Sequence, residues 1–418
     1  MYGEIITIGN ELTSGRTVDI NSWYAAGRLT ASGLGVIRVT SVGDDVQMVT
    51  RALKRAHTSS RFVIVTGGLG TTEDDMTCKI AAHALNRPLR LDREMLKKIQ
   101  HYIDAQGIKM TPPLEKMAYM PEGARMLNPT GGTCGFSIED KEVRFYFLPG
   151  VPEQSRYLMD TVVLPELLGL YEALPVMGQR IIKIYGMNEP HIAEKLDQLR
   201  GKIGEVVLGF YPRFPENHLT LSLKGEDNAQ VTAVLDRVEQ EITAILGTCV
   251  FSTDGQDMEE VVGRILVQKE MTLSVAESCT GGLIGHRLTN VPGSSQYYQG
   301  GVVSYSNRLK TALLGVNEET LKRHGAVSAK TAKEMAQGVR RQTGSHLGLA
   351  TTGIAGPEGG TREKPVGTVY IGLCRGEEAL STGYRFSGDR QQIKQQSATM
   401  ALDWIRRYLS GYSFLPGI

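Results

Sequence analysis

The sequence predicts an α/β protein in which short apolar strands alternate with helices. Residues 61–66 (RFVIVT) form an unbroken apolar run, which is typical of a parallel strand buried on both faces. A glycine loop, Gly67–Gly70, and a polar helix start follow it, and the same order recurs after residues 272–276. This repeated order of strand, glycine loop and helix predicts parallel sheets covered by helices.

Length and charge restrict the class of protein. The 418 residues predict two or three domains, at roughly 150 residues per domain. The 46 Lys and Arg residues nearly balance the 45 Asp and Glu residues, giving a formal net charge of +1. This balance argues against a nucleic-acid-coating protein.

Cysteine usage and hydropathy predict a cytoplasmic protein with reduced thiols. The five cysteines are odd in number and contain no C-x-x-C pair, which argues against a disulfide framework or a zinc site. They are Cys78, Cys134, Cys249, Cys279 and Cys374. No apolar stretch approaches the ~18–20 residues of a membrane span, and the N-terminus lacks the pattern of a signal peptide.

Hydrophobic patterning divides the chain into three expected domains, 1–170, 171–255 and 256–418. In the first, we expect strands at 3–8, 36–42, 61–66 and 144–148, and helices at 20–32 and 47–56. The second reads as a small α+β unit, with strands at 181–185, 206–210, 219–224 and 249–251 and helices at 189–199 and 228–246. In the third, we expect strands at 272–276, 300–305, 346–352 and 367–375. The expected helices are 257–269, one that follows Gly282 and ends at about 289, and 390–409.

Glycine is the outlier in composition. The 48 glycines are about 11.5% of the chain, against a usual ~7%. The surplus is steepest in residues 256–418, and several glycines stand where strands end. We interpret it as backbone left bare so that phosphates and a carboxamide can approach.

Ser278 stands between a predicted strand and a helix N-terminus. The N–H groups of Thr280, Gly281 and Gly282 are expected to point outward there, as donors to an oxyanion. Ser278 is either a helix N-cap or a nucleophile, and a nucleophile needs a base. A desolvated, neutral lysine can be that base. Lys310 follows Tyr305 by five residues, although the two could equally be a surface lysine and a half-buried strand aromatic.

A second candidate site follows the apolar strand 61–66. Glycine N–H groups, hydroxyl groups and a helix N-terminus suit a phosphate. Asp74 and Asp75 either bind a divalent cation that bridges phosphates or complement the helix dipole. The loop is not a Walker motif, because no G-K-[ST] follows it.

Four motifs of the C-terminal third resemble the CinA C-terminal domain, the nicotinamide-nucleotide amidase family. They are AESCTGG (276–282), GGVVSYSNRLK (300–310), TTGIAGP (351–357) and KPVGTVYI (364–371). The resemblance implies hydrolysis of nicotinamide mononucleotide to nicotinate mononucleotide and ammonia, without a cofactor. Ser278 would be the nucleophile, Lys310 its base and Tyr305 a relay, with the oxyanion hole near Thr280 and Gly281. The residues expected to line the nucleotide pocket are Thr351, Thr352, Gly353 and Gly356.

The N-terminal part resembles the MoaB/MogA-like molybdopterin-binding fold, as it occurs in CinA proteins. The matching pieces are IGNELTSG (8–15), VGDD (42–45), residues 66–77 and LPGVP (148–152). The resemblance implies an ADP-ribose pyrophosphatase that depends on Mg, Mn or Co, with Asp74 and Asp75 as metal ligands. The implied substrate contacts are Asn10, Glu11, Asp44, Gly67, Gly68, Gly70 and Thr72. Two pieces depart from the family pattern, because Gly70-Thr71-Thr72 replaces Gly-Pro-Thr and Gly9-Asn10-Glu11 replaces Gly-Thr-Glu.

The middle segment resembles the small KH-like domain of CinA proteins. Residues Gly201–Gly204 have the G-x-x-G spacing of an RNA clamp, but the charge balance favours a structural or dimerisation role. The family resemblance also implies a homodimer. An alternative to a two-site enzyme is a molybdopterin-like ligand-binding or regulatory protein of competence or damage response, without N-terminal catalysis.

Overall fold

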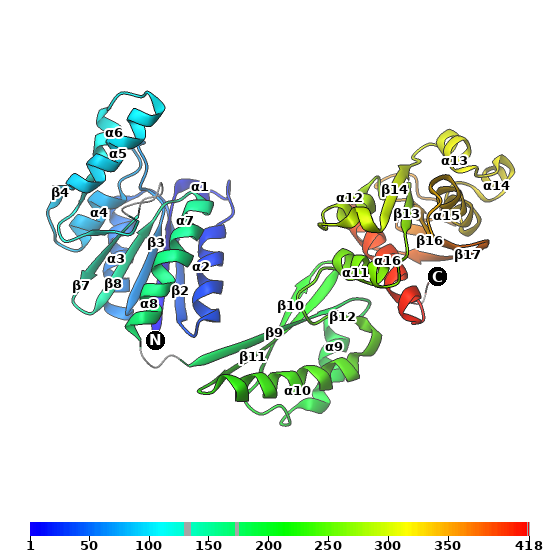
Figure 1. The fold of residues 1–418 in the computed structure, drawn as a ribbon, viewed down its shortest axis with the longest axis horizontal. Coiled ribbons are helices and arrows are strands. Elements are labelled where there is room, and N and C mark those ends of the chain that lie inside the picture. The colour runs from blue at the N-terminus through cyan, green and yellow to red at the C-terminus, as the bar shows by residue number, and fades with distance from the viewer. Residues whose placement is uncertain (129–134, 172–174, 416, 418) are drawn as a thin grey trace. The chain divides into compact units, whose positions relative to one another are not determined.

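The computed structural model describes residues 1–128, 135–171, 175–415 and 417. The chain divides into two compact units, Met1–Gly178 with Leu223–Thr232, and Gln179–Ser222 with Ala233–Ile418 (Figure 1). The expected domain limits at 170 and 255 stay predictions. Cys134 lies outside the described residues, and the other four cysteines are free thiols.

The first unit contains a six-stranded sheet in the order β2-β1-β3-β8-β7-β6. The strands β1, β2, β3 and β8 run parallel, whereas β7 is antiparallel to β8 and β6 is antiparallel to β7. The predicted parallel sheet is therefore a mixed one, because a two-residue loop such as 141–142 can join only antiparallel strands. The strands are β1 (Tyr2–Ile8), β2 (Gly35–Val42), β3 (Phe62–Thr66), β6 (Arg125–Met126), β7 (Phe136–Asp140) and β8 (Val143–Leu148).

Helices cover both faces of this sheet (Figure 1). One layer contains α2 (Ile20–Ala31), α7 (Pro152–Leu158), a π-helical turn (Met159–Val163) and α8 (Leu164–Leu170). The other contains α3 (Val46–Ser59), α4 (Thr77–Ala84) and α5 (Arg93–Gln106). The prediction that β3 is buried on both faces is confirmed, because Phe62 packs in the first layer and Val63 in the second. The remaining elements are α1 (Asn10–Thr13), α6 (Pro112–Lys116) and the strand pair β4 (Leu89–Leu91) and β5 (Tyr119–Pro121).

Residues 176–252 form a four-stranded sheet in the order β10-β11-β9-β12. The strands are β9 (Val176–Ile184), β10 (Val207–Arg213), β11 (Glu216–Gly225) and β12 (Val250–Ser252). The helices are α9 (Glu189–Leu196), α10 (Asn228–Leu246) and the 3-10 turns Asp197–Leu199 and Gly247–Cys249. The predicted α+β pattern is confirmed, with the helix predicted at 189–199 ending in a 3-10 turn.

The C-terminal part has a five-stranded sheet in the order β14-β13-β15-β16-β17. Here β14, β13 and β15 are parallel, while β16 and β17 are antiparallel additions, so this sheet is also mixed. The strands are β13 (Leu273–Glu277), β14 (Tyr298–Val303), β15 (Leu347–Gly353), β16 (Thr368–Arg375) and β17 (Glu378–Arg385).

Two helical layers enclose this five-stranded sheet. One contains α11 (Met258–Gln268), α12 (Leu283–Thr289) and α16 (Arg390–Ser410). The other contains α13 (Asn307–Leu314) and α15 (Ala329–Thr343). A 3-10 turn (Ser294–Gln296) and α14 (Glu318–His324) complete the domain.

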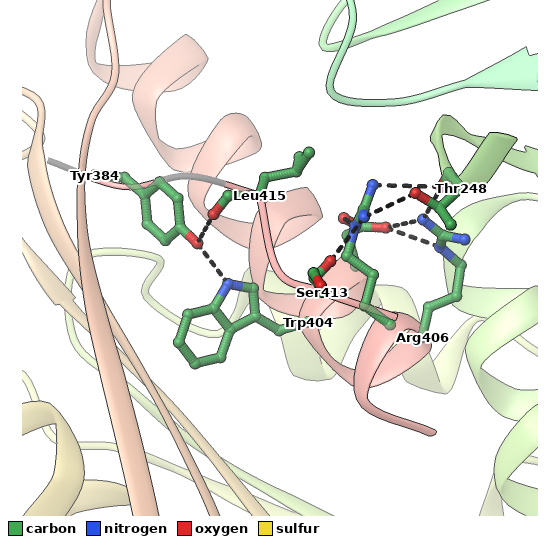
Figure 2. A network of polar contacts seen from close by, with 8 residues as sticks. Thr248, Tyr384, Trp404, Arg406, Ser413 and Leu415 are labelled. Carbon is green, nitrogen blue, oxygen red and sulfur yellow. Dashed lines mark hydrogen bonds and ion pairs between the residues drawn. The ribbon is translucent and has the colours of Figure 1, made fainter. Parts of the chain in front are cut away.

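A buried polar network fixes the end of α10 to α16 (Figure 2). The Asp403 carboxylate is 0% exposed and accepts hydrogen bonds from Arg406 Nη2 and Arg407 Nε, each at 2.6 Å. Both guanidinium groups also donate to the Thr248 carbonyl oxygen. Beside them, Trp404 Nε1 donates to the Tyr384 hydroxyl at 2.8 Å. Residues near 248 are thereby held on the C-terminal core.

Among the described residues, no helix has both the length and the apolar character needed to cross a membrane.

Candidate active sites

The first candidate site lies at the carboxyl ends of the parallel strands β13, β14 and β15. Glu277 pairs with Val303 on one side and with Thr351 on the other, so the residues that follow these strands meet at one sheet edge. Ser278 and Ser304 are the next residues along β13 and β14. In open α/β sheets, this edge is where ligands bind.

Ser278 and Lys310 are in direct contact. Lys310 Nζ lies 3.0 Å from Ser278 Oγ and donates to the Ser304 carbonyl oxygen at 2.7 Å. Lys310 is in the first turn of α13, and helical side chains point back toward the N-terminus of their helix. The helix start is fixed by Ser306, whose side chain accepts from the Leu309 N–H. Local capping therefore aims Lys310 at the end of β13.

The surroundings of Lys310 favour its neutral form. The residue is only 1% exposed, and this burial lowers the pKa of its amine below 10.5, outweighing the smaller opposite effect of Cys279. No carboxylate of the described residues forms an ion pair with it. A neutral amine in this position has a lone pair that can accept the proton of the Ser278 hydroxyl.

Glu277 organises the loop after Ser278. Its buried carboxylate accepts the N–H groups of Gly282, Ile284 and Gly285, at 2.9, 3.1 and 2.8 Å, and so caps α12. The Gly281 N–H donates to the Ser278 carbonyl oxygen at 3.2 Å. The expectation that the N–H groups of Gly281 and Gly282 face an oxyanion is therefore wrong, because both have protein acceptors.

The N–H groups of Cys279 and Thr280 are the remaining candidates for an oxyanion hole. In the described parts of the chain, neither donates to a protein oxygen. Burial raises the pKa of the neighbouring Cys279 thiol to about 12. A protonated thiol is a weak acceptor, so these two donors can serve a developing oxyanion next to Ser278.

Tyr305 is placed differently from the expected relay. It is 59% exposed, and its hydroxyl accepts a hydrogen bond from Arg390 Nη2 at 2.8 Å. Over the described residues, it makes no hydrogen bond to Ser278 or Lys310. Arg390 also donates to the Gly356 carbonyl oxygen at 2.6 Å, which brings three loops together. Sequence reasoning missed Arg390, because it stands 85 positions from Tyr305 at an ordinary helix start.

The residues expected to line a nucleotide pocket are mostly structural in their contacts. Thr351 and Thr352 are buried; Thr351 shares a 2.8 Å hydrogen bond with the Thr280 hydroxyl, and Thr352 donates to the Ala326 carbonyl oxygen. A Cβ at Gly353 would stand 2.6 Å from Val369. Gly356 has a φ of +78° and turns the loop that Arg390 holds. The hydroxyl groups thus brace the site rather than face solvent.

The second candidate site lies at the carboxyl edge of β1, β2 and β3. Asn10 and Asp44 exchange two hydrogen bonds: the Asn10 N–H donates to Asp44 Oδ2 at 2.9 Å and the Asp44 N–H donates to Asn10 Oδ1 at 3.1 Å. Partial burial raises the pKa of Asp44, and the charges of Asp74, Glu11 and Asp75 raise it further. The two hydrogen bonds join the loops that follow β1 and β2.

The glycine loop beside these carboxylates is tightly packed. Gly67 has a φ of +105°, and its N–H donates to the Leu148 carbonyl oxygen at 3.1 Å. A Cβ at Gly68 would stand 2.2 Å from Thr77 Oγ1, and one at Gly70 would stand 2.5 Å from Asp75 Oδ2. The Gly67 N–H of the predicted phosphate loop is therefore not free to bind a phosphate, because it donates to a protein carbonyl oxygen.

Asp74 and Asp75 differ in their hydrogen bonds and in their exposure to solvent. Asp75 Oδ2 accepts the Thr72 N–H at 2.9 Å and the Thr72 hydroxyl at 2.5 Å, so it closes a turn. Asp74 is exposed, and hydrogen bonding, with Thr72 first, lowers its pKa. Among the described residues, no group of three or more His, Cys, Asp or Glu side chains is arranged to hold a metal ion alone. The two proposed ligands do not form a complete metal site by themselves.

Three family models match consecutive parts of the chain. They are the probable molybdopterin binding domain over residues 4–169, the damage-inducible protein CinA KH domain over 179–252 and the CinA C-terminal domain over 255–409. The three resemblances inferred from motifs are confirmed, and so is the α/β class.

Relatives match over nearly the whole chain. A CinA-like protein of Desulfotalea psychrophila is 40% identical over 407 residues, 97% of this chain and 98% of the relative. A putative competence-damage inducible protein of Caldicellulosiruptor saccharolyticus is 40% identical over 413 residues, 99% and 100% of the two chains. The solved structure of a CinA superfamily protein from Klebsiella pneumoniae is 32% identical, covers 38% of this chain and 100% of that chain, and has a TM-score of 0.36.

Proposed function

Because the chain belongs to the CinA family, we propose that its C-terminal domain hydrolyses nicotinamide mononucleotide to nicotinate mononucleotide and ammonia. The observation that carries the proposal is the contact of 3.0 Å between Ser278 Oγ and the buried amine of Lys310. A serine with a neutral lysine as its base is a known variant of nucleophilic catalysis.

In the proposed reaction, Ser278 Oγ attacks the carboxamide carbon while Lys310 takes the hydroxyl proton. The resulting oxyanion is held by the N–H groups of Cys279 and Thr280. Protonated Lys310 then gives its proton to the leaving nitrogen, so that ammonia departs and an ester on Ser278 remains. Water attacks this ester with Lys310 again as base, which releases the carboxylate product and restores the serine.

The positions of Tyr305 and Arg390 support a role in holding the substrate rather than in proton transfer. Arg390 fixes the Tyr305 hydroxyl and the Gly356 carbonyl oxygen, both at the edge where the loops after β14 and β15 lie. We propose that this pair shapes the nucleotide side of the site.

For the N-terminal domain, we propose a divalent-metal-dependent ADP-ribose pyrophosphatase that forms AMP and ribose 5-phosphate. The specific observation in its favour is the pair of hydrogen bonds between Asn10 and Asp44, which joins the loops that follow the parallel strands β1 and β2. Carboxylate oxygens suit Mg, Mn or Co, and such ions are often held by one or two carboxylates together with substrate phosphates. Bound there, the ion would neutralise the diphosphate and activate water.

Within that site, this chain's own residues do the positioning. Asp44 and Asp74 would face the cation, whereas Asp75 keeps the loop closed through Thr72. Asn10 holds Asp44 in place through their two hydrogen bonds.

One experiment tests both activities. The purified protein is incubated with nicotinamide mononucleotide and, separately, with ADP-ribose, each with added divalent metal and with a chelator. We expect the chelator to leave the rate of ammonia release unchanged and to abolish AMP release. Chelator-sensitive ammonia release would contradict the amidase mechanism. Binding of ADP-ribose without turnover would favour the alternative, a molybdopterin-like ligand-binding or regulatory role.

Three further expectations accompany the proposal: a cytoplasmic location, a homodimer, and no nucleic-acid partner. Gly201 and Gly204 have φ values of +77° and +61°, so the G-x-x-G segment forms an open turn. A salt-dependent shift of single-stranded RNA by the protein would contradict the last expectation.

A further inference from the structure

A second cation faces the Ser278 loop from α16. Lys394 lies four residues after Arg390, so the two side chains share one face of the helix. Its Nζ lies 3.7 Å from where a Cβ would stand at Gly281, three residues after Ser278. Gly281 has a φ of +62° and no side chain, which leaves the approach to Lys394 open.

The charge of Lys394 is not neutralised by the protein. Although the residue is partly buried, it forms no ion pair and no hydrogen bond with any described residue. Arg390 likewise donates only to neutral oxygens, the Gly356 carbonyl and the Tyr305 hydroxyl. Lys394, near the loop that follows the candidate nucleophile, and Arg390, one helical turn before it, are therefore two cations without an acidic partner among the described residues. Lys394 is partly buried, so its ammonium has lost part of its hydration without gaining an anion, whereas Arg390 is exposed.

We propose that Lys394 binds the phosphate monoester of the nucleotide substrate and thereby selects nucleotides over nucleosides. The proposal rests on the amidase function proposed above. A lysine ammonium makes strong, charge-assisted hydrogen bonds to phosphate oxygens, and Arg390 on the same helix face adds to the positive potential. A phosphate held by Lys394 would lie beside Gly281, three residues after Ser278 in the chain.

The test compares Lys394→Met with Lys394→Arg and with Lys333→Met. Lys333 is a matched control, because it is also a partly buried lysine of the same domain and stands on α15, in the opposite helical layer. KM and kcat are measured with nicotinamide mononucleotide and with nicotinamide riboside, which lacks the phosphate.

We expect Lys394→Met to raise KM for the nucleotide at least about tenfold, the loss typical of a charged hydrogen bond, while kcat changes little. The riboside should be processed equally by wild type and variant. Lys394→Arg should retain most of the discrimination, and Lys333→Met all of it. An unchanged KM for the nucleotide, or an equal loss with both substrates, would overturn the proposal.

A binding measurement separates this proposal from the amidase proposal. Calorimetric titration with nicotinate mononucleotide, the amidase product, needs no turnover and, unlike ribose 5-phosphate, is not also a product of the reaction proposed for the N-terminal site. Binding by wild type that weakens at least about tenfold in Lys394→Met supports the phosphate site even if no ammonia is released. Equal binding by both proteins, or none by wild type, overturns it. Thermal denaturation of each variant verifies that it is folded.

Discussion

At the scale of single residues, burial gives Lys310 its chemistry. A lysine in solution is protonated at neutral pH, whereas this one is enclosed beside Ser278, and the removal of water favours its neutral amine. The same burial destabilises the fold below pH 10.5, because the unfolded chain holds the lysine proton more strongly than the folded chain does.

The pH dependence of the amidase follows from this burial. Lys310 must be neutral to act as a base, so kcat/KM for nicotinamide mononucleotide should rise with pH and level off through an apparent pKa below 10.5. Stability should rise over the same window, between the lowered folded pKa and 10.5, because there the unfolded chain binds more protons. Rate profiles and urea titrations over pH measure both. A rate that falls as pH rises toward 10.5 would contradict a neutral lysine base.

Motifs predicted some of these residues and not others. Ser278 and Lys310 were recognisable from the spacing of AESCTGG and SYSNRLK, and the structure brings them together. The cap that Glu277 forms on α12 was not predicted, because its partners are backbone groups of a loop whose path the sequence does not specify. Arg390 was invisible for the same reason, since its partners lie in two distant loops.

At the scale of elements, many glycines serve packing rather than ligand access. A Cβ at Gly348 in β15 would stand 2.1 Å from the Ala336 carbonyl oxygen of α15, and one at Gly372 in β16 would stand 2.3 Å from that of Ala332. These glycines let the helix approach the sheet closely. The interpretation of the surplus as bare backbone for ligands therefore fails for this part of the domain.

A pair of alanine substitutions tests the packing account. Gly338→Ala would place a Cβ 1.9 Å from the Leu314 carbonyl oxygen, so we expect a loss of about 1–3 kcal/mol or more in the free energy of unfolding. Gly27→Ala, inside α2 with nothing within 4 Å, should instead stabilise by about 0.5–1 kcal/mol. Urea denaturation measures both. Equal effects of the two substitutions would contradict the account.

The sequence patterns predicted element types well but strand direction poorly. An apolar run followed by a glycine loop predicted each of the parallel strands β1, β3, β13 and β15. The antiparallel additions β7 and β17 were not, because each joins its neighbour by a tight turn without a strong hydrophobic signal. The hairpin between β16 and β17 turns at Gly376, with a φ of +57°.

At the scale of the whole molecule, the middle segment and the C-terminal domain share a core. Tyr185 and Phe251, from β9 and β12, pack in the same hydrophobic cluster as Trp404 of α16. The Asp403 network adds polar contacts to Thr248. No short-range pattern predicts such a contact between Thr248 and Arg406, which stand 158 positions apart, and so the sequence left the role of the middle segment open.

The Asp403 network should contribute strongly to the free energy of unfolding of this shared core. Asp403→Asn leaves two buried guanidinium groups without a carboxylate, so we expect a loss of about 3–5 kcal/mol in the free energy of unfolding. Asp254→Asn is the matched control, because its ion pair with Arg264 is half exposed and should contribute at most about 1 kcal/mol. Urea denaturation measures the free energy of unfolding of both variants. A loss for Asp403→Asn no larger than that for the control would contradict a strong contribution of the Asp403 network.

The central claim is that Ser278 is the nucleophile of a nicotinamide-nucleotide amidase, and ammonia release by Ser278→Ala tests it most directly. Ser274→Ala is the matched control, because Ser274 is a buried serine of the same strand β13 whose hydroxyl has no hydrogen-bond partner among the described residues. With nicotinamide mononucleotide, we expect a loss of at least about a thousandfold in kcat for Ser278→Ala and near-normal release for Ser274→Ala. Release by Ser278→Ala at the wild-type rate would remove Ser278 from the mechanism.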